Sequence, residues 1–355
     1  MSSQPIRKNH VGGGKFQIGK CFSGFDHIHW YVGNAKVSAD YYIQAFGFER
    51  VAFRGLETGF RSSASHVVRR NDVTFVFTSP YSASAKGEFG DIIGDHLLSH
   101  GDGVKDVAFK VDDCRAAFAE AVSRGSKVIR DVTELKDDHG SVIVCSLQTY
   151  GDTVHTLVER RNYRGAFLPG FVASPPAPPQ KKRPSAFPDL RFVDHVVGNQ
   201  GEGEMERAAD WYRDKLDFHR FWSVDDKQIH TQYSALRSIV MADDSHTIKM
   251  PINEPAPGLR KSQIQEFVEF YGGPGVQHIA LNTPDCVQAV ACLETRGVEF
   301  LEIPGAYYDS LKSRLASANI DVGHDVQRLR ELNILVDFDE SGYLLQIFTK
   351  PLQDR

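Results

Sequence analysis

The stretch that fixes the fold reads YGGPGVQHIALNT, residues 271–283. A turn of three glycines and a proline leads into an apolar strand, residues 276–281, that carries one imidazole, His278. Because side chains alternate along a strand, His278 is expected to share a face with Val276, and Gln277 is expected on the other face. A buried imidazole has to bond a neighbour or bind a ligand, so this strand is a candidate for a functional site.

A second stretch has the same form. Residues 192–199, FVDHVVGN, place His195 among apolar neighbours in another expected strand. The two histidines are 83 positions apart in the chain, yet each stands in the first strand of a structural unit. First strands of paired units lie side by side in one curved sheet, so His195 and His278 are expected to converge.

The units repeat along the chain. After a polar arm at residues 1–20, a strand, a helix and three more strands are expected, and after a loop at residues 79–96 the same series follows again. A proline-rich linker, residues 168–190, then separates two similar halves. The predicted fold is α+β with two homologous domains, residues 21–167 and 191–355, each made of two β-α-β-β-β modules that form a half-open barrel.

The repeat is supported residue by residue. Asp40 corresponds to Asp210 at an offset of 170, and Asp113 corresponds to Asp285 at an offset of 172. The dipeptide Asp-His at residues 26–27 aligns with the same dipeptide at residues 194–195. In contrast, His278 aligns with Asp106 of the first half. The two halves therefore share a fold but differ at the candidate site.

Composition excludes several classes of protein. Hydrophobic residues make up 41% and charged residues 25% of 355 residues, with a net charge of −5, so neither nucleic acid nor an anionic membrane is an expected partner. No apolar run approaches the length of a membrane span and no signal peptide is evident, which favours a cytoplasmic location. The five cysteines lack a Cys-x-x-Cys pair and are expected to be reduced.

Two converging neutral imidazoles are the nitrogen part of the two-histidine, one-carboxylate arrangement that holds non-haem iron(II). Alone this pair is weak evidence, because a pair chosen from 14 histidines is more often structural. Longer motifs add to it: FVDHVVGN, MPINEP at residues 250–255, KSQIQ at 261–265, GVQHIAL, and GYLLQIFTKP at 342–351. Together they closely resemble the 4-hydroxyphenylpyruvate dioxygenase family over nearly the whole chain.

The resemblance implies a vicinal-oxygen-chelate fold, a non-catalytic first domain, and an iron(II) enzyme that converts 4-hydroxyphenylpyruvate and O2 to homogentisate and CO2 in tyrosine breakdown. It also implies a homodimer. By the family's motifs His195 and His278 match the two histidine ligands, and the polar and apolar residues expected around the substrate are Gln277, Gln346, Ser238, Asn253, Gln263, Phe348 and Pro251. Carboxamides and a hydroxyl form a neutral network that suits a phenol and a keto acid.

The family's third iron ligand, a glutamate, would lie about six residues past Arg355 on the family pattern, and Glu340 is expected in a hairpin turn instead. We therefore expect the 355-residue chain to be impaired in iron binding and turnover. Two alternatives stay open: a 4-hydroxymandelate synthase type of enzyme, which hydroxylates the benzylic carbon, and a non-catalytic truncated relative.

A rival metal site is conceivable in the first half. His27, Asp106 and Glu159 align with the two histidines and the glutamate of the family's triad, and His29 lies beside them. We favour the interpretation that these are buried polar residues bonded to one another, because buried polar groups are usually satisfied in that way.

Overall fold

The computed structural model describes residues 16–82, 90–175, 187–223, 229–230, 235–258, 261–339 and 342–353. The first half contains η1 (Ile18–Lys20), β1 (Phe22–Tyr31), α1 (Ala35–Phe46), β2 (Glu49–Arg54), η2 (Leu56–Thr58), β3 (Ser63–Arg70), β4 (Val73–Pro80), α2 (Gly90–His100), β5 (Gly103–Val111), α3 (Cys114–Ser123), β6 (Val128–Asp137), β7 (Gly140–Gln148), β8 (Val154–Glu159) and β9 (Val172–Ala173). The second half contains β10 (Val193–Asn199), α4 (Met205–Leu216), β11 (His219–Ser223), β12 (Ile229–His230), β13 (Ala235–Ala242), β14 (Lys249–Ala256), α5 (Gln263–Tyr271), β15 (Gly275–Leu281), α6 (Cys286–Glu294), α7 (Gly305–Ala318), α8 (Val326–Glu331), β16 (Leu335–Asp339) and β17 (Gly342–Gln346).

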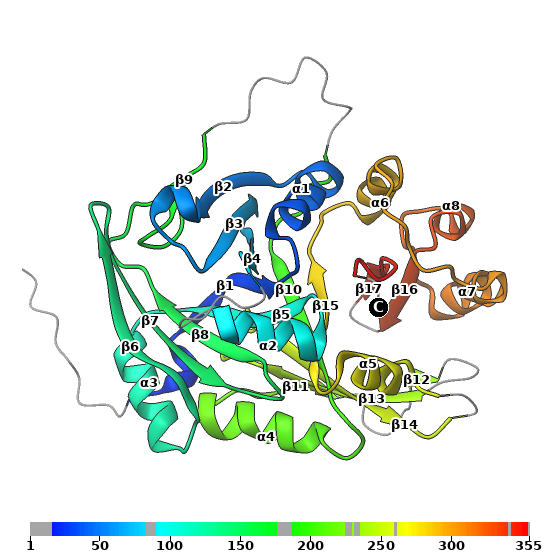
Figure 1. Cartoon of the computed structure of the whole chain (residues 1–355). Helices are drawn as coiled ribbons and strands as arrows, with labels where there is room; N and C mark the ends of the chain where they lie inside the picture. The colour runs from blue at the N-terminus through cyan, green and yellow to red at the C-terminus, as the bar shows by residue number, and fades with distance from the viewer. Residues whose placement is uncertain are drawn as a thin grey trace, which may run out of the picture.

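The first half is a single curved sheet with the strand order β6-β7-β8-β5-β1-β4-β3-β2-β9. Its two modules meet where β1 runs antiparallel to β5. Each module is a strand, a helix and three further strands, as the sequence predicted, and the mixed α+β fold of two homologous halves is confirmed (Figure 1).

The second half repeats this plan in its first module. In its second module β15 is followed by three helices, α6, α7 and α8, and within the described residues by the two strands β16 and β17 in place of the three strands that the sequence predicted. The main sheet of the second half has the order β11-β13-β14-β10-β15, and β10 runs antiparallel to β15 as β1 does to β5. The hairpin β16–β17 is a separate two-stranded sheet, and helices α7 and α8 come before it in the chain (Figure 1). In the first half the corresponding hairpin is β6–β7. There β8 pairs with β7 on one side and runs parallel to β5 on the other, and so joins the hairpin to the main sheet.

Helices cover the outer faces of both sheets because their apolar residues recur on one side. On α1, Tyr42 stacks on Phe46 and on Phe77 of β4, with ring centroids 5.3 and 5.1 Å apart. Asn34 caps the start of α1 by accepting from the Val37 amide, and the helix stops where a glycine takes a left-handed conformation.

One core runs through both halves, so they pack on each other. Phe22 of β1 meets Phe218 edge to face at 5.0 Å, and His155 of β8 bonds the hydroxyl of Tyr212 on α4 at 2.7 Å. The ring of Tyr271 fills the space between the first residues of β5 and β15. A Cβ on Gly103 would lie 2.8 Å, and one on Gly275 2.4 Å, from carbon atoms of this ring.

Several sequence expectations differ from the structure. The loop expected at residues 79–96 is in part α2, whose buried side carries His96 and His100 beside Ile93, so that no apolar stripe marks the helix. Ile18, expected in a polar arm, is fully buried. Residues 172–173, expected in the linker, form β9, which pairs with β2. Residues 1–15 of the arm and 176–186 of the linker lie outside the described residues, as does Glu340. Within the described part of the chain, none of the helices has the length and apolarity to cross a bilayer.

Candidate metal centre

Two β-bulges shape the centre of the second half. The register between β10 and β15 shifts between Val193 and His195 and again between Val197 and Gly198. The first shift leaves Asp194 as an extra residue in β10, and the second leaves Gln277 as an extra residue in β15. A bulge breaks the alternation of side chains and redirects them. Each extra residue can therefore reach the side chain of the histidine that follows it.

The bulges correct one sequence expectation. Strict alternation puts Val276 on the face of His278 and Gln277 on the opposite face. In the structure Val276 packs into the main core with Ile279, whereas Gln277 bonds His278. The single extra residue reverses the assignment, and a sequence pattern alone does not reveal it.

His195 is held by a pair of charged neighbours. Its Nδ1 bonds Asp194 Oδ2 at 2.8 Å, and Asp194 Oδ1 accepts from Lys249 Nζ at 3.0 Å. The hydrogen bond from His195 and the ammonium group of Lys249 lower the pKa of Asp194 to about 2, so the carboxylate stays charged. With the Nδ1 proton donated to this carboxylate, the lone pair of Nε2 is free.

His278 is held in the same way by a neutral partner. Its Nδ1 bonds Gln277 Oε1 at 2.6 Å. Burial, together with the smaller effect of the nearby His195, lowers the pKa of His278 to about 3, so the ring is neutral at neutral pH. The rings of His195 and His278 meet edge to face with centroids 5.8 Å apart. Two imidazoles that converge in this way, each with Nε2 unbonded by its neighbour, fit a divalent cation.

A row of polar side chains crosses the same inner face. Ser238 of β13 stands opposite Asn253 of β14, and Asn253 stands opposite Asn199 of β10. Asn253 Nδ2 reaches Asn199 Oδ1 at a long 3.5 Å, while the amide nitrogens of Asn199 and Gln200 are buried without a hydrogen-bond partner. Buried donors of this kind usually find a partner, so the amide of Asn199 is available to a polar ligand on this face. The sequence analysis missed Asn199, although its spacing from His195 could have indicated it.

The other expected site residues are spread around the pair. Phe348 meets His278 edge to face at 5.2 Å, and Pro251 lies on β14 two positions before Asn253. Gln346 ends β17 and donates to Asp337, and Gln263 is the exposed first residue of α5. The structure thus brings Phe348 to the histidine pair, whereas Gln346 is bonded within its hairpin.

The rival set in the first half is bonded within the protein. His27 Nδ1 bonds Asp26 at 2.7 Å, Asp106 accepts from the amide and hydroxyl of Thr156, and Glu159 accepts from the Cys114 amide at 2.8 Å. Over the residues that the structure describes, no three His, Cys, Asp or Glu side chains are grouped as a metal site. Among the described residues, no third side chain of these four types joins His195 and His278.

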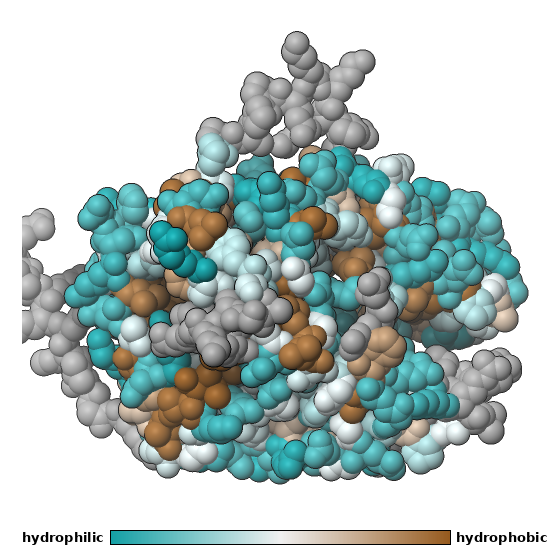
Figure 2. Space-filling view, in the orientation of Figure 1, coloured by the Kyte–Doolittle hydropathy of each residue, from teal (hydrophilic) through white to brown (hydrophobic). Residues whose placement is uncertain are grey.

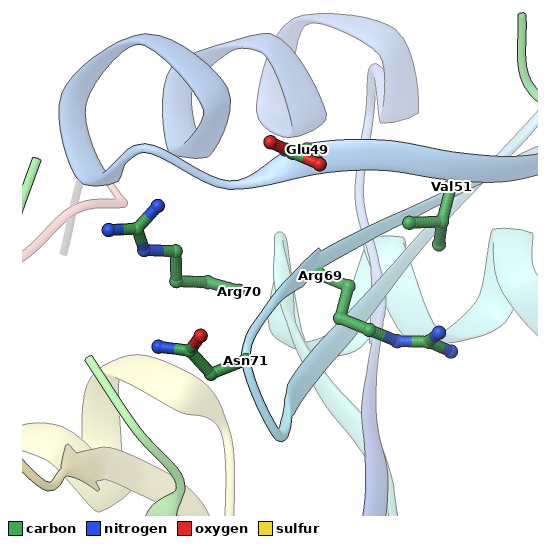
Figure 3. Close-up of a pocket in the computed structure, with 5 residues that line it drawn as sticks. All are labelled: Glu49, Val51, Arg69, Arg70 and Asn71. Carbon is green, nitrogen blue, oxygen red and sulfur yellow. The ribbon is translucent and has the colours of Figure 1, made fainter. Parts of the chain in front are cut away.

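A hollow of about 200 Å³ lies elsewhere, at the hairpin of β3 and β4 and the start of β2. Figure 3 shows Arg69 and Arg70 directed to opposite sides of the hairpin beside Glu49. Arg69 donates to the carbonyl of Ala166, and Arg70 to those of Gly47 and Pro188. These bonds tie the hairpin to the chain around it.

Comparisons with known proteins identify the fold and the family of the chain. The model of the Glyoxalase/Bleomycin resistance protein/Dioxygenase superfamily matches residues 24–157 and 193–347, which define the class of fold. The chain is 53% identical over 346 residues to a 4-hydroxyphenylpyruvate dioxygenase of Tetrahymena thermophila, covering 96% of this chain and 84% of the relative. It is 54% identical to that of Caenorhabditis elegans, covering 97% and 86%. The chain belongs to the 4-hydroxyphenylpyruvate dioxygenase family, whose members are metal-dependent oxidoreductases.

Among solved structures, a variant of 4-hydroxymandelate synthase from Streptomyces coelicolor is similar, with a TM-score of 0.77 and 30% identity over 94% of this chain and 89% of that one. Its identity to this chain is well below that of the two dioxygenases.

Proposed function

We propose that the chain converts 4-hydroxyphenylpyruvate and O2 to homogentisate and CO2 with iron(II) held by His195 and His278. The observation that carries this proposal is the pair of imidazoles whose Nδ1 atoms are bonded to Asp194 and Gln277, leaving both Nε2 atoms free. Iron(II), when bound, supplies the activation of dioxygen. Imidazole nitrogens with a carboxylate suit this metal, and family membership supports the choice.

The protein's own residues would orient the substrate. Ser238 and Asn253 offer a hydroxyl and an amide from neighbouring strands, and the unpartnered amide of Asn199 lies in the same row. These neutral groups can bind the substrate's oxygens without competing with the charge of the metal. Phe348 against His278 supplies an apolar wall that excludes water on one side.

For the carboxamides we propose two different roles. Gln277 fixes the tautomer of His278, because its oxygen accepts the Nδ1 proton. Gln346 and Gln263 come from β17 and α5, and in the bound state we assign them contacts to the phenol and the keto acid. Pro251 and Phe348 would complete the apolar lining.

The test is an assay of the purified chain loaded with iron(II) under O2, with 4-hydroxyphenylpyruvate as substrate. Chromatography against standards, followed by fragmentation in a mass spectrometer, distinguishes homogentisate from its isomer 4-hydroxymandelate. The solved 4-hydroxymandelate synthase makes the latter the second candidate. Binding of the keto acid without either product, and without stoichiometric iron, would contradict both enzymatic functions and favour a non-catalytic role.

We further propose a cytoplasmic homodimer. None of the five cysteines forms a disulfide, in keeping with a reducing compartment. Exposed apolar side chains, among them Ile92 and Leu98 on α2 and Ile129 on β6, offer contact area for a second copy. Figure 2 shows apolar patches set among hydrophilic residues on one face of the molecule.

A further inference from the structure

The first half carries a polar cluster at the place that corresponds to the candidate centre of the second half. Arg54 of β2 stands opposite Ser65 of β3, Ser65 opposite Thr78 of β4, and Thr78 beside Tyr31 of β1. The same three-strand row in the second half is Ser238, Asn253 and Asn199. The duplicated fold thus presents two polar rows on equivalent inner faces, one of which contains an arginine.

The cluster is held together by hydrogen bonds and ring contacts. Ser65 bonds the Thr78 hydroxyl at 2.8 Å, and Thr78 bonds His29 Nε2 at 2.7 Å. The ring of His29 meets Tyr31 at 5.3 Å, and Tyr31 meets His96 of α2 at 5.4 Å. Residues from β1, β3, β4 and α2 therefore form one continuous group.

Several polar atoms in and around this group have no hydrogen-bond partner. Arg54 Nε, Ser63 Oγ and both ring nitrogens of His96 are buried without a hydrogen bond, and His96 is 5% exposed. Unsatisfied buried polar atoms are few in native proteins, and each one calls for a ligand, a water or an ion. Three such side chains around one row mark it as a candidate binding site.

The arginine sets the charge of the site. The guanidinium carbon of Arg54 lies 4.1 Å from the ring centroid of Phe60 and 4.7 Å from that of Phe171, and over the residues described no carboxylate pairs with it. Burial and the nearby Arg130 lower the pKa of Arg54 to about 10, so the group stays charged at neutral pH. A largely buried cation without a counter-ion among the described residues is costly, and an incoming anion would lower that cost.

The remaining groups limit the ligand to a single negative charge. Burial lowers the pKa of His96 to about 3 and that of His29 well below its ordinary value, so both rings are neutral near pH 7. The oxygens of Asp106, the acid nearest to this row on β5, are occupied by Thr156. One cation, neutral donors and aromatic rings suit a carboxylate attached to an apolar body better than a phosphate dianion.

We propose that the first half binds a small monoanionic organic carboxylate, whose oxygens accept from Arg54 and His96 and whose apolar part lies along Phe60, Phe171 and Tyr31. This site is separate from the histidine pair of the second half and does not depend on the proposed reaction. It uses no metal, because His27 and Asp106 are already bonded to Asp26 and Thr156.

The probe is benzoate, titrated by calorimetry into the full-length chain after removal of metal by a chelator. The expected result is one benzoate per chain, at least tenfold weaker binding by Arg54→Gln, and unchanged binding by Arg61→Gln, which removes an exposed arginine of the same half. Arg54→Lys keeps the charge but loses the planar fork, and should bind with intermediate strength.

Two further variants keep the result decisive. Ser238→Ala alters the equivalent row of the second half and should leave benzoate binding unchanged, whereas His96→Phe weakens it without removing charge. Circular dichroism melts check that each variant is folded. No binding to the parent chain, equal binding by Arg54→Gln, or loss of binding in Ser238→Ala would each overturn the proposal.

Discussion

The inner faces of the two halves started from one plan and now differ in what covers them. In the first half His27 is 5% exposed, bonded to Asp26, and covered by the ring of Phe167 at 5.0 Å. In the second half the side chain of His195 is 28% exposed and faces a second imidazole at 5.8 Å. The same strand and the same bulge thus support a closed core in one half and an accessible pair of imidazoles in the other.

The difference lies in the covering segment more than in the histidine. Phe167, Leu168 and Phe171 pack on Ala52 and Val67 of the inner face of the first half. Asp26 is also fixed from outside by Arg160, which donates to both carboxylate oxygens at 2.7 Å. These contacts close the inner face around His27, whereas the inner face around His195 stays accessible.

Removal of a histidine should separate the halves most strongly. We expect His278→Ala to abolish iron binding and homogentisate formation, because one Nε2 ligand is lost. His27→Ala should retain both, since its ring is bonded within the protein. Iron per chain, measured by a colorimetric chelator, and product by chromatography test this pair. Equal loss in both variants would contradict the assignment of the centre to the second half.

Removal of the covering ring should cost stability and not chemistry. Phe167 is 2% exposed, so Phe167→Ala is expected to lower the free energy of unfolding by about 3–5 kcal/mol. Urea unfolding measures the loss, and turnover per folded chain should stay unchanged. Phe192→Ala, at an exposed phenylalanine, is the control and should change stability little.

The contact between the halves should make stability sensitive to acid. Burial lowers the pKa of His155 from 6.5 to about 4 while its ring bonds Val107 O and the Tyr212 hydroxyl. The unfolded chain takes up this proton below pH 6.5 and the folded chain only near pH 4, so stability is present above 6.5 and falls between these values.

At pH 5 this loss amounts to about 2 kcal/mol for His155. Urea titrations at pH 7.5 and 5.0 measure it, and His155→Gln should reduce the difference between the two. The variant His139→Gln, in a turn, should leave the difference as it is. An unchanged pH dependence in His155→Gln would mean that other groups carry it.

Substitution of a residue that orients one of the two histidines should change iron affinity less than removal of a histidine. Asp194→Asn keeps the size of the side chain but removes the charge that holds His195, and iron affinity should fall about 10- to 100-fold. Iron titrations with a competing chelator measure this change. The equivalent Asp26→Asn in the first half should leave iron affinity unaltered and lower stability, because Arg160 loses its ionic partner.

Much of this comparison follows from the sequence, and part of it does not. The constant offsets predicted two similar halves, and pairing of their first strands predicted that β10 and β15 are neighbours. The bulges could not be predicted, because an extra residue in a ladder depends on the register of the partner strand. Helix α2 was missed since its buried side carries His96 and His100. The polar cluster around Arg54 could not be predicted, because it depends on the pairing of strands that are far apart in the sequence.

The aromatic ring between the two strand starts makes the halves interdependent. Gly103 and Gly275 are equivalent positions, and both close on Tyr271, which also carries the stacked ring of His100 at 4.4 Å. Adding a methyl group at either glycine would push on the same ring and thereby disturb both sheets at once. A substitution that one half would tolerate here is therefore restricted by the other half. Separation of the chain at the linker would leave two fragments, each exposing the surface that packs at this contact.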